Sequence, residues 1–306
     1  MFGKFKHYLA IARLDHWFKN IFMLPGIVIP WIYLSPEIDV LLFIKLVVGV
    51  LSTCFIASAN YVINEWLDAE FDRFHPVKKH RPSVTQGLKQ NYVYLEYALF
   101  GLAGLGMAMW VDLRFFYVAL FFLIMGFMYN VRPFRTKDRP YIDVISESIN
   151  NPIRLTLGWL MVSPETFPPS SLLVSYWFGG AFLMATKRFS EFRFINDKES
   201  ASLYRKSFGF YDEQKLMVSV VFYALVSTFF LAIFLFKHRL ELIVAFPFIA
   251  LIFAWYLNMG YDENSPAQRP EKLYKQKSFI AYLGFVVVLV VALMLVDIPF
   301  LEVFQQ

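Results

Sequence analysis

The sequence has a single cysteine, few charged residues and no low-complexity tract. Cys54 lies in an apolar run and has no partner, so neither a disulfide framework nor a cysteine metal site is expected. Only 17% of the 306 residues are charged whereas 58% are hydrophobic, which is too apolar for an ordinary soluble protein of this length. Because no Gly/Ser linker interrupts the pattern, nothing in the sequence indicates a second, soluble domain.

Apolar runs of about 17 to 25 residues, the length that crosses a bilayer as a helix, recur along the chain. They predict an all-α integral membrane protein with about nine transmembrane helices, folded as a single domain over residues 1–306. Residues 1–20 lack the apolar core and cleavage site of a signal peptide, so we expect them to form an interfacial helix. We place the spans at 21–34, 41–63, 91–111, 114–130, 142–161, 172–186, 216–236, 240–258 and 278–296.

Most of the 29 Lys and Arg residues lie in the N-terminal segment and in four long connections. These connections are residues 64–90, 131–141, 187–215 and 259–277. By the positive-inside rule, we expect the N-terminus and these loops to face the cytoplasm of a bacterial-type cytoplasmic membrane. The same distribution explains the net charge of +5, so we expect no nucleic-acid partner.

A row of amide and acidic side chains follows the second span. Asn64, Asp68 and Asp72 recur every four residues and share one helical face, and Glu65 lies one turn from Asp68. Mg²⁺ favours one or two carboxylates together with phosphate oxygens and water. One acid at this position would be an ordinary solvated helix end, but the set favours a site for Mg²⁺ and phosphate.

A basic run, Lys78-Lys79-His80-Arg81, comes soon after the acids. A loop that obeys the positive-inside rule explains any single lysine in this run about equally well. Arg81 is the member that favours phosphate binding, because the following Pro82 fixes the local backbone and restricts the conformation of its predecessor.

The stretch from Asn64 to Asp72 resembles the motif N-D-x-x-D-x-x-x-D of the UbiA-type intramembrane transferases, with Glu65 in place of the first aspartate. The resemblance implies a helical bundle with a central cavity, from which a Mg²⁺-bound diphosphate leaves. It also implies that Asn64, Glu65, Asp68 and Asp72 hold the metal. The replacement at Glu65 keeps the charge and lengthens the side chain.

Other stretches resemble one branch of that family, the decaprenyl-phosphate phosphoribosyltransferases. The run Lys187-Arg188-Phe189-Ser190-Glu191 and the later Arg205 and Tyr211 stand where prenyl-transferring members carry a second aspartate-rich motif. Asp197 is a lone aspartate between them.

The N-terminal half of the chain agrees with the same branch. Arg13, His16-Trp17 and Lys19-Asn20 resemble its R-P-x-x-W-x-K-N, with Leu14 in place of the proline. The spacing of Lys137, Asp143 and Arg154 also matches.

The resemblance implies a role for each of these residues. Asp143 joins Asp68 and Asp72 as a catalytic residue, and we expect Asp143 to orient ribose hydroxyls. Glu191 and Glu147 are candidates for residues that support the site, and Glu147 has no counterpart in the pattern of the branch. For the donor phosphates we expect Arg81, Lys137, Arg154, Lys187, Arg188, Arg205 and Tyr211 as ligands, and for the acceptor phosphate Arg13, Lys19 and Asn20.

Arg154 is informative without the family, because it lies about three turns into a span. A lone charge there costs roughly 2.5 to 3.5 kcal/mol on insertion scales, so it should face a polar cavity. A structural network with Asp143, Glu147, Asn150 and Asn151 on the same helix is the alternative explanation.

Three functions remain open from the sequence. The first is a Mg²⁺-dependent phosphoribosyltransferase that uses phosphoribosyl pyrophosphate as donor and a polyprenyl phosphate as acceptor, feeding glycan assembly in the cell envelope. The second is a UbiA-type prenyltransferase that moves an isoprenoid from a prenyl diphosphate to an aromatic or other small acceptor. The third is a transporter or lipid-binding scaffold, which the single-sided acidic motifs disfavour. A homo-oligomer is compatible with all three.

Overall fold

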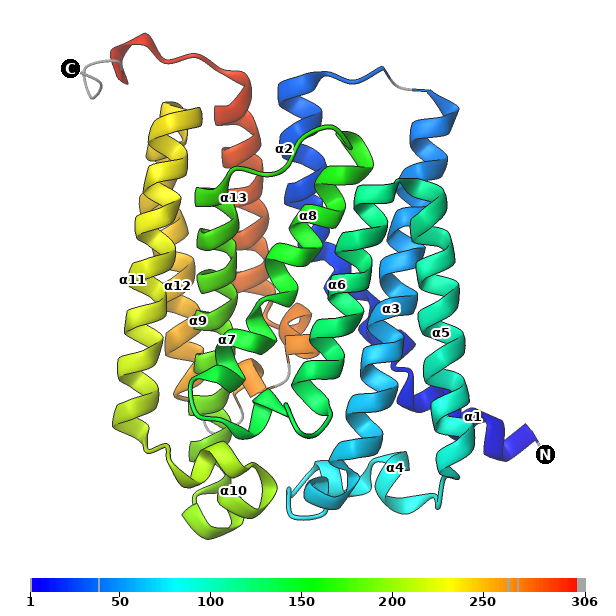
Figure 1. The fold of residues 1–306 in the computed structure, drawn as a ribbon. Helices are drawn as coiled ribbons and strands as arrows, with labels where there is room; N and C mark the ends of the chain where they lie inside the picture. Colours follow the sequence, from blue (N-terminus) through cyan, green and yellow to red (C-terminus); the bar gives the residue numbers. More distant parts are fainter. Residues whose placement is uncertain (1, 38, 263–264, 269, 302–306) are drawn as a thin grey trace. The chain divides into compact units, whose positions relative to one another are not determined.

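The computed structural model describes residues 2–37, 39–262, 265–268 and 270–301, and all of their regular secondary structure is helical (Figure 1). This confirms the all-α fold class. The chain divides into two compact units. The first holds residues 1–168 and 195–211, and the second holds residues 169–194 and 212–306.

Within the described ranges, seven helical segments are long and apolar enough to cross a membrane. They are Lys6–Leu34, Val40–Asp72, Gln90–Val111, Leu113–Asn130, Glu213–His238, Leu240–Gly260 and Lys277–Leu295. The two other spans expected from the sequence are helical but do not meet these criteria, so the count of nine is not confirmed. One of them is divided into α7 (Ile142–Ser148) and α8 (Asn150–Val162), and the other is α9 (Ser170–Ile195).

The N-terminal segment is two helices rather than one interfacial helix. Helix α1 (Phe2–Ile11) ends before Arg13, which takes the left-handed conformation with φ 50°. A 3₁₀ helix, η1 (Leu14–Met23), then leads into α2 (Leu24–Leu34).

Helix α3 (Val40–Asp72) is the longest element of the first unit, with 33 residues. The Asp39 side chain caps its start by accepting a hydrogen bond from the Leu42 amide at 2.6 Å. A helix of this length measures about 50 Å, whereas the hydrocarbon core of a bilayer is about 30 Å thick. The helix is therefore longer than the apolar layer is thick, and its last turns carry the acidic row.

Helices α5 (Gln90–Val111), α6 (Leu113–Asn130) and α8 surround α3 in the first unit. Their shared core contains Ile56, Phe115, Phe122 and Leu157, each at most 2% exposed. The core fixes the end of α3 against the end of α6, where the polar site begins.

Short helices occupy the connections of the first unit that the sequence predicts as loops. They are η2 (Lys78–His80), α4 (Pro82–Thr85), η3 (Thr136–Asp138), α10 (Lys198–Tyr204) and η4 (Lys206–Gly209).

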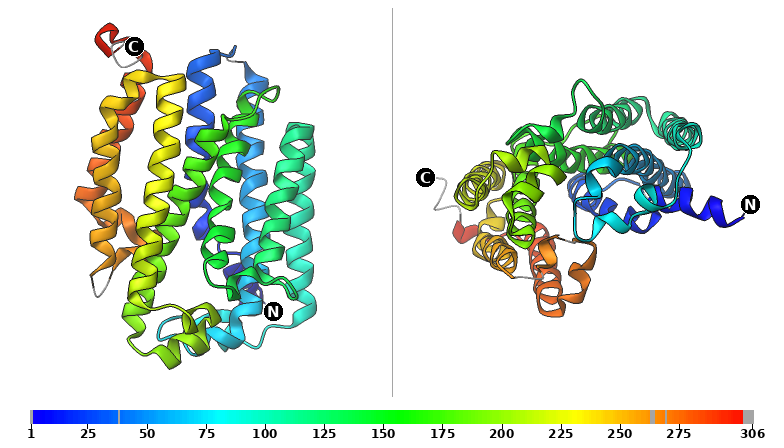
Figure 2. Two further views of the ribbon diagram at one scale, coloured as in Figure 1. Left: turned by 60° about the vertical axis from the view of Figure 1, so that its left-hand side comes forward. Right: turned by 90° about the horizontal axis from the view of Figure 1, so that it is seen from below.

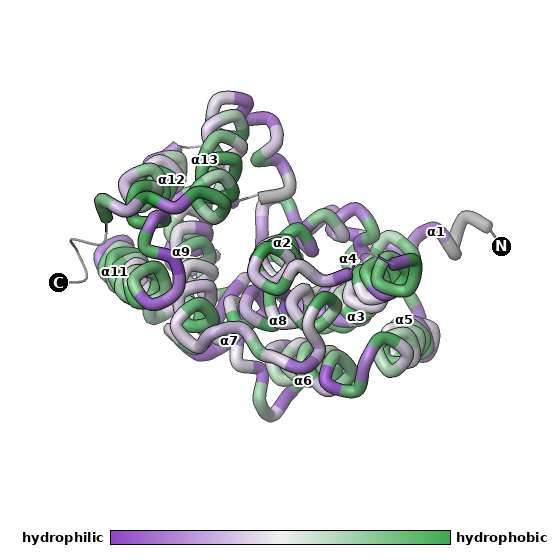
Figure 3. Tube along the Cα trace, turned by 90° about the horizontal axis from the view of Figure 1, so that it is seen from above, coloured by the Kyte–Doolittle hydropathy of each residue, from purple (hydrophilic) through white to green (hydrophobic). Residues whose placement is uncertain are grey.

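The second unit contains α9, α11 (Glu213–His238), α12 (Phe246–Gly260) and α13 (Lys277–Leu295). Figure 2 shows α11 as one unbroken helix, and Figure 3 shows α11 and α13 as mainly hydrophobic. The Ser227 hydroxyl donates to the Ser175 carbonyl at 2.9 Å, which joins α11 to α9.

Short 3₁₀ helices complete the second unit. They are η5 (Leu240–Ala245), η6 (Pro266–Gln268) and η7 (Pro270–Lys275). The predicted loop 259–277 includes residues 263, 264 and 269, which lie outside the described residues.

Helices α2 and α8 approach closely at Gly26 and Gly158. The contact at Gly26 gives a stability prediction. A Cβ built on Gly26 would lie 1.9 Å from the Leu155 carbonyl oxygen, a backbone atom that cannot move away alone. Gly26→Ala should therefore lower stability by about 1–3 kcal/mol, measured as the midpoint of thermal unfolding in detergent. Gly106 is the matched control, because its Cβ would meet no atom within 4 Å. An equal loss of stability in both variants would contradict the close contact.

Candidate functional site

The acidic row lies on the last three turns of α3, as the sequence predicts. The Asn64 amide donates to Asp68 Oδ2 at 3.1 Å and to Asn130 Oδ1 at 2.6 Å. Asn130 is the last residue of α6 and is 2% exposed. The two helix ends are thus joined by amide and carboxylate side chains.

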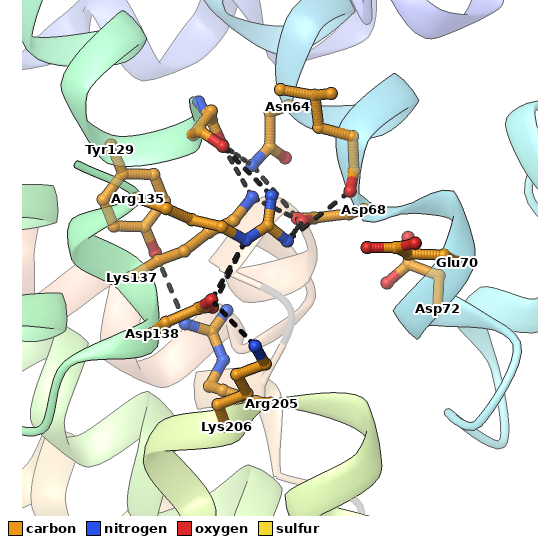
Figure 4. A network of polar contacts seen from close by, with 12 residues as sticks. Asn64, Asp68, Glu70, Asp72, Tyr129, Arg135, Lys137, Asp138, Arg205 and Lys206 are labelled. Atoms are coloured by element: carbon orange, nitrogen blue, oxygen red, sulfur yellow. Dashed lines mark hydrogen bonds and ion pairs between the residues drawn. The ribbon is translucent and has the colours of Figure 1, made fainter. Parts of the chain in front are cut away.

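Asp68 is held by two cations from the connection after α6 (Figure 4). Arg135 Nη2 lies 3.1 Å from Asp68 Oδ1, and Lys137 Nζ donates to the same oxygen. Lys137 Nζ also donates to Asn130 Oδ1 at 2.8 Å. Burial lowers the pKa of Lys137 to about 8, even though the Asp68 carboxylate favours its charged form. The predicted residues Asp68 and Lys137 therefore do meet.

Arg135 is a member of the site that the sequence analysis missed. Its guanidinium reaches Asp138 Oδ2 at 3.2 Å, the Asn130 carbonyl at 3.0 Å and the face of Phe71 at 4.8 Å from the ring centroid. Arg132 in the same basic connection is instead exposed. Only burial distinguishes the two arginines, and no spacing in the sequence reports it.

Asp72 pairs with Arg81, which joins α3 to the loop that follows it. Arg81 has the extended backbone that its position before Pro82 favours, with φ −65° and ψ 149°. Burial disfavours the charge on Arg81, but the neighbouring Asp72 and Glu65 carboxylates hold its pKa above the ordinary value.

Glu65 is paired with the N-terminal segment. Its Oε2 atom accepts from Arg13 Nε at 2.7 Å and lies 2.6 Å from Arg13 Nη2, and Ser83 Oγ is 3.5 Å from Oε1. Glu65 is 2% exposed. The carboxylate thus ties α3 to the N-terminal segment and to α4, and Arg13, expected at the acceptor phosphate, is its partner.

A small pocket opens beside the carboxylates. It is lined by Asp68, Phe71, Asp72, Arg135, Lys137, Asp138, Tyr204 and Arg205. Across the described part of the chain, no group of three or more His, Cys, Asp or Glu side chains is arranged to hold a metal by itself. Two of the lining carboxylates, Asp68 and Asp72, still match the need of Mg²⁺ for one or two protein carboxylates completed by phosphate oxygens and water. The residues therefore fit a metal that arrives with a diphosphate.

Asp143 lies behind the pocket rather than among its lining residues. It is fully buried, and its carboxylate accepts from Tyr211 Oη at 2.8 Å and from Ser207 Oγ at 3.1 Å. Arg205 Nη1 is 3.9 Å from the same carboxylate and 3.4 Å from Tyr129 Oη. Asp143 and Tyr211 thus fix the segment that brings Arg205 to the pocket.

Glu147 lies close to the same arginine. Its Oε2 atom accepts from Tyr129 Oη at 2.7 Å, so the carboxylate and Arg205 share one tyrosine hydroxyl.

Arg154 and Asn20, assigned from the sequence to different phosphates, contact each other inside the first unit. Arg154 Nε donates to Asn20 Oδ1 at 2.9 Å, and its guanidinium lies 4.9 Å from the Phe122 ring centroid. Arg154 is 7% exposed. Lys19 Nζ lies 5.7 Å from the Tyr61 ring centroid.

Of the residues expected after the sixth span, Lys187, Arg188 and Glu191 lie in the second unit and are described within it, whereas Arg205 and Tyr211 lie in the first. Lys187, Arg188 and Glu191 belong to α9, which continues to Ile195, so the expected loop boundary at 187 is wrong. The buried Arg188 and Glu191 form an ion pair at 3.6 Å, one helical turn apart. Lys187 is half-buried.

A helical chain with seven segments long and apolar enough to cross a membrane, counted over its described residues, is an integral membrane protein. Its pocket at the end of α3 is lined by carboxylates and cations. The chain belongs to the UbiA prenyltransferase family, whose sequence model matches residues 22–282.

Individual relatives match parts of the chain. Decaprenyl-phosphate phosphoribosyltransferase of Mycolicibacterium smegmatis is 27% identical over 173 residues, which cover 56% of this chain and 52% of that protein. Nodulation protein NoeC of Azorhizobium caulinodans is 32% identical over 84 residues, which cover 28% of this chain and 26% of that protein. The chain thus spans about half or less of the length of these relatives.

The fold has a close counterpart among solved structures. A UbiA homolog from Archaeoglobus fulgidus, bound to GPP and Mg²⁺, aligns with a TM-score of 0.70 at 20% sequence identity. The alignment covers 92% of this chain and 99% of that chain. It confirms the expected UbiA-type fold.

Proposed function

We propose that this protein transfers the 5-phosphoribosyl group from phosphoribosyl pyrophosphate to a polyprenyl phosphate and releases pyrophosphate. The similarity to decaprenyl-phosphate phosphoribosyltransferase supports this assignment over 56% of the chain. The site residues, the metal and both substrates belong to the proposal, as does the cytoplasmic orientation of the pocket.

The observation that carries the proposal is the role of the segment that contains Asp197. This aspartate accepts from the Ser200 amide at 2.8 Å and caps α10, so it is occupied at the start of a helix. The hydrogen bonds from Ser200 hold the pKa of Asp197 below its ordinary value. The same segment delivers Arg205 to the pocket lining. A cation at this position suits a donor with additional phosphate better than it suits a second metal.

Bond making and breaking are simple for these substrates. A phosphate oxygen of the polyprenyl phosphate forms a bond to the anomeric carbon of the ribose, and the bond from that carbon to the pyrophosphate oxygen breaks. The attacking phosphate is already anionic, so no protein group needs to remove a proton from it. Bound Mg²⁺ supplies stabilisation of the negative charge that develops on the leaving pyrophosphate.

The protein side chains hold and orient the substrates. Asp68 and Asp72 would hold the metal, while Arg81, Arg135, Lys137 and Arg205 bind phosphate oxygens through charge-assisted hydrogen bonds. Each of the two carboxylates already contacts one or more of these cations. When a metal and a diphosphate bind, the carboxylates would exchange their cation partners for the metal. The cations would exchange their carboxylate partners for phosphate oxygens.

The remaining assignments belong to the same proposal. Arg13, Lys19 and Asn20 contribute to binding of the acceptor phosphate, and Arg154 contributes to the donor side. Lys187 and Arg188 stay sequence-based predictions for donor phosphate, and Glu191 is the ion-pair partner of Arg188 within the second unit. Asp143 and Tyr211 act by fixing Arg205.

The test uses purified protein in detergent or liposomes with radiolabelled phosphoribosyl pyrophosphate, polyprenyl phosphate and Mg²⁺. The expected result is transfer of label to an anionic lipid with release of pyrophosphate, abolished by EDTA and restored by added Mg²⁺. Absence of labelled lipid would contradict the proposal.

A second candidate is transfer of an isoprenoid from a prenyl diphosphate to a small acceptor. The family description and the GPP-bound structural relative favour it. Turnover of a prenyl diphosphate with an aromatic acceptor, with no labelled lipid from phosphoribosyl pyrophosphate, would establish this activity instead.

A further inference from the structure

Tyr204, the last residue of α10, lines the pocket together with the carboxylates and Arg205. It is 6% exposed, and residues from the loop after α3 enclose its ring. The His75 ring meets it edge to face with centroids 4.6 Å apart. Lys78 Nζ lies 4.5 Å from the ring centroid and donates a hydrogen bond to Tyr204 Oη. The loop after α3, which is far from Tyr204 in the sequence, thus holds this aromatic side chain beside the site.

The loop that holds Tyr204 is itself fixed. The buried His75 accepts at Nδ1 from the backbone amides of Val77 at 3.1 Å and Lys78 at 3.2 Å. Its own amide donates to the Asp72 carbonyl at 3.1 Å, so the loop continues directly from the end of α3. The position of the Tyr204 ring is therefore set relative to the Asp72 end of the acidic row.

The chemistry of Tyr204 differs from that of the rest of the pocket. Asp68, Asp72, Lys137 and Arg205 offer charges, which suit a metal and phosphate oxygens. Tyr204 adjoins Arg205 in the chain and adds an uncharged aromatic side chain to the pocket lining. Its ring centroid also lies 5.8 Å from the Arg205 guanidinium carbon and 6.2 Å from the Phe208 ring centroid, so the C–H groups of a sugar can pack only against the part of the side chain that lines the pocket. A donor bound with its diphosphate at the charged groups needs a neutral surface for the group that it transfers.

We propose that Tyr204 is a specificity-determining residue that contacts the ribose of the donor, held in place by His75 and Lys78. This inference rests on the proposed function, because only a sugar donor brings a ribose to the pocket. Lys78 restrains the ring by a hydrogen bond to the Tyr204 hydroxyl, and the His75 ring restrains it by an edge-to-face contact.

The test compares Tyr204→Ala, Tyr204→Phe and Leu203→Ala in the full-length protein. Leu203 precedes Tyr204 on α10, is 48% exposed and is absent from the pocket lining, which makes it a matched control. Tyr204→Ala should raise the KM for phosphoribosyl pyrophosphate about tenfold or more and leave the KM for polyprenyl phosphate near its original value. Tyr204→Phe keeps the ring and should retain most of the donor affinity, and Leu203→Ala should match the wild type.

Inhibition by two donor fragments separates sugar contact from a general change in the pocket. Tyr204→Ala should weaken inhibition by ribose 5-phosphate but not inhibition by pyrophosphate, which has no sugar. Equal weakening of both inhibitors, or an unchanged donor KM in Tyr204→Ala, would overturn the inference while the wild-type activity stands. If the wild type makes no labelled lipid from phosphoribosyl pyrophosphate, the proposed function fails first and the inference fails with it.

Discussion

Replacing Asp68 by Asn is expected to lower kcat/KM by about a hundredfold to a thousandfold, the range found when one charge-stabilising group is removed from an active site. The amide keeps the size of the side chain but removes the negative charge that would hold the metal and orient Lys137 and Arg135. Asp72→Asn should cause a loss of similar size, because Asp72 lines the same pocket. The lipid transfer assay measures both.

Glu70→Gln is the matched control for these variants. Glu70 lies on the same helix between the two aspartates, its side chain is 56% exposed, and it approaches Arg132 only at 3.8 Å. It should retain wild-type turnover. Elution as a single folded species in size exclusion shows that the aspartate variants lose chemistry rather than structure. Substantial turnover by folded Asp68→Asn would remove Asp68 from the catalytic set.

The parts of the site that depend on local spacing were predictable from the sequence. Asn64, Asp68 and Asp72 share a face because four residues make about one turn, and the structure places them on one continuous helix. The extended conformation of Arg81 follows from the ring of the next proline. Seven of the expected spans were predictable for the same kind of reason, since a long apolar run determines its own helix.

Side-chain reach and tertiary burial were not predictable in this way. Glu65 matches the family motif in charge, yet its longer arm meets Arg13, and Arg13 comes from a segment more than fifty residues earlier. Arg135 and Arg132 occupy one basic connection, and only the packing of Phe71 and Asn130 selects the first. Asp143 matches the spacing of the family branch, but the spacing does not show that its buried carboxylate accepts hydrogen bonds from Ser207 and Tyr211.

The sequence also contains a local signal for the start of α10. Asp197 stands immediately before a short helical segment, a position at which aspartate is a favoured N-cap residue. The cap accounts for the lone aspartate of the 187–211 stretch by a structural role. It also explains how Arg205, at the other end of that helix, comes to the pocket.

Arg135→Ala is expected to lower turnover about a hundredfold and to destabilise the protein by about 1–3 kcal/mol. The guanidinium simultaneously contacts the carboxylates of Asp68 and Asp138 and the Asn130 carbonyl, and its side chain is 7% exposed. Its removal leaves buried acceptors without their donor, and it removes a cation proposed to bind phosphate. Steady-state kinetics and thermal unfolding measure the two effects.

Arg135→Lys and Arg132→Ala divide these effects. Lysine restores the charge but cannot reproduce a planar fork that reaches several acceptors at once, so Arg135→Lys should recover stability in part and activity poorly. Arg132 has a side chain that is 68% exposed in the same connection, and Arg132→Ala should behave like the wild type. If Arg135→Ala unfolds at a lower temperature but keeps its kcat and its donor KM, Arg135 only supports the fold. If Arg132→Ala loses as much activity as Arg135→Ala, the general positive charge of the connection matters rather than the buried contact with Asp68.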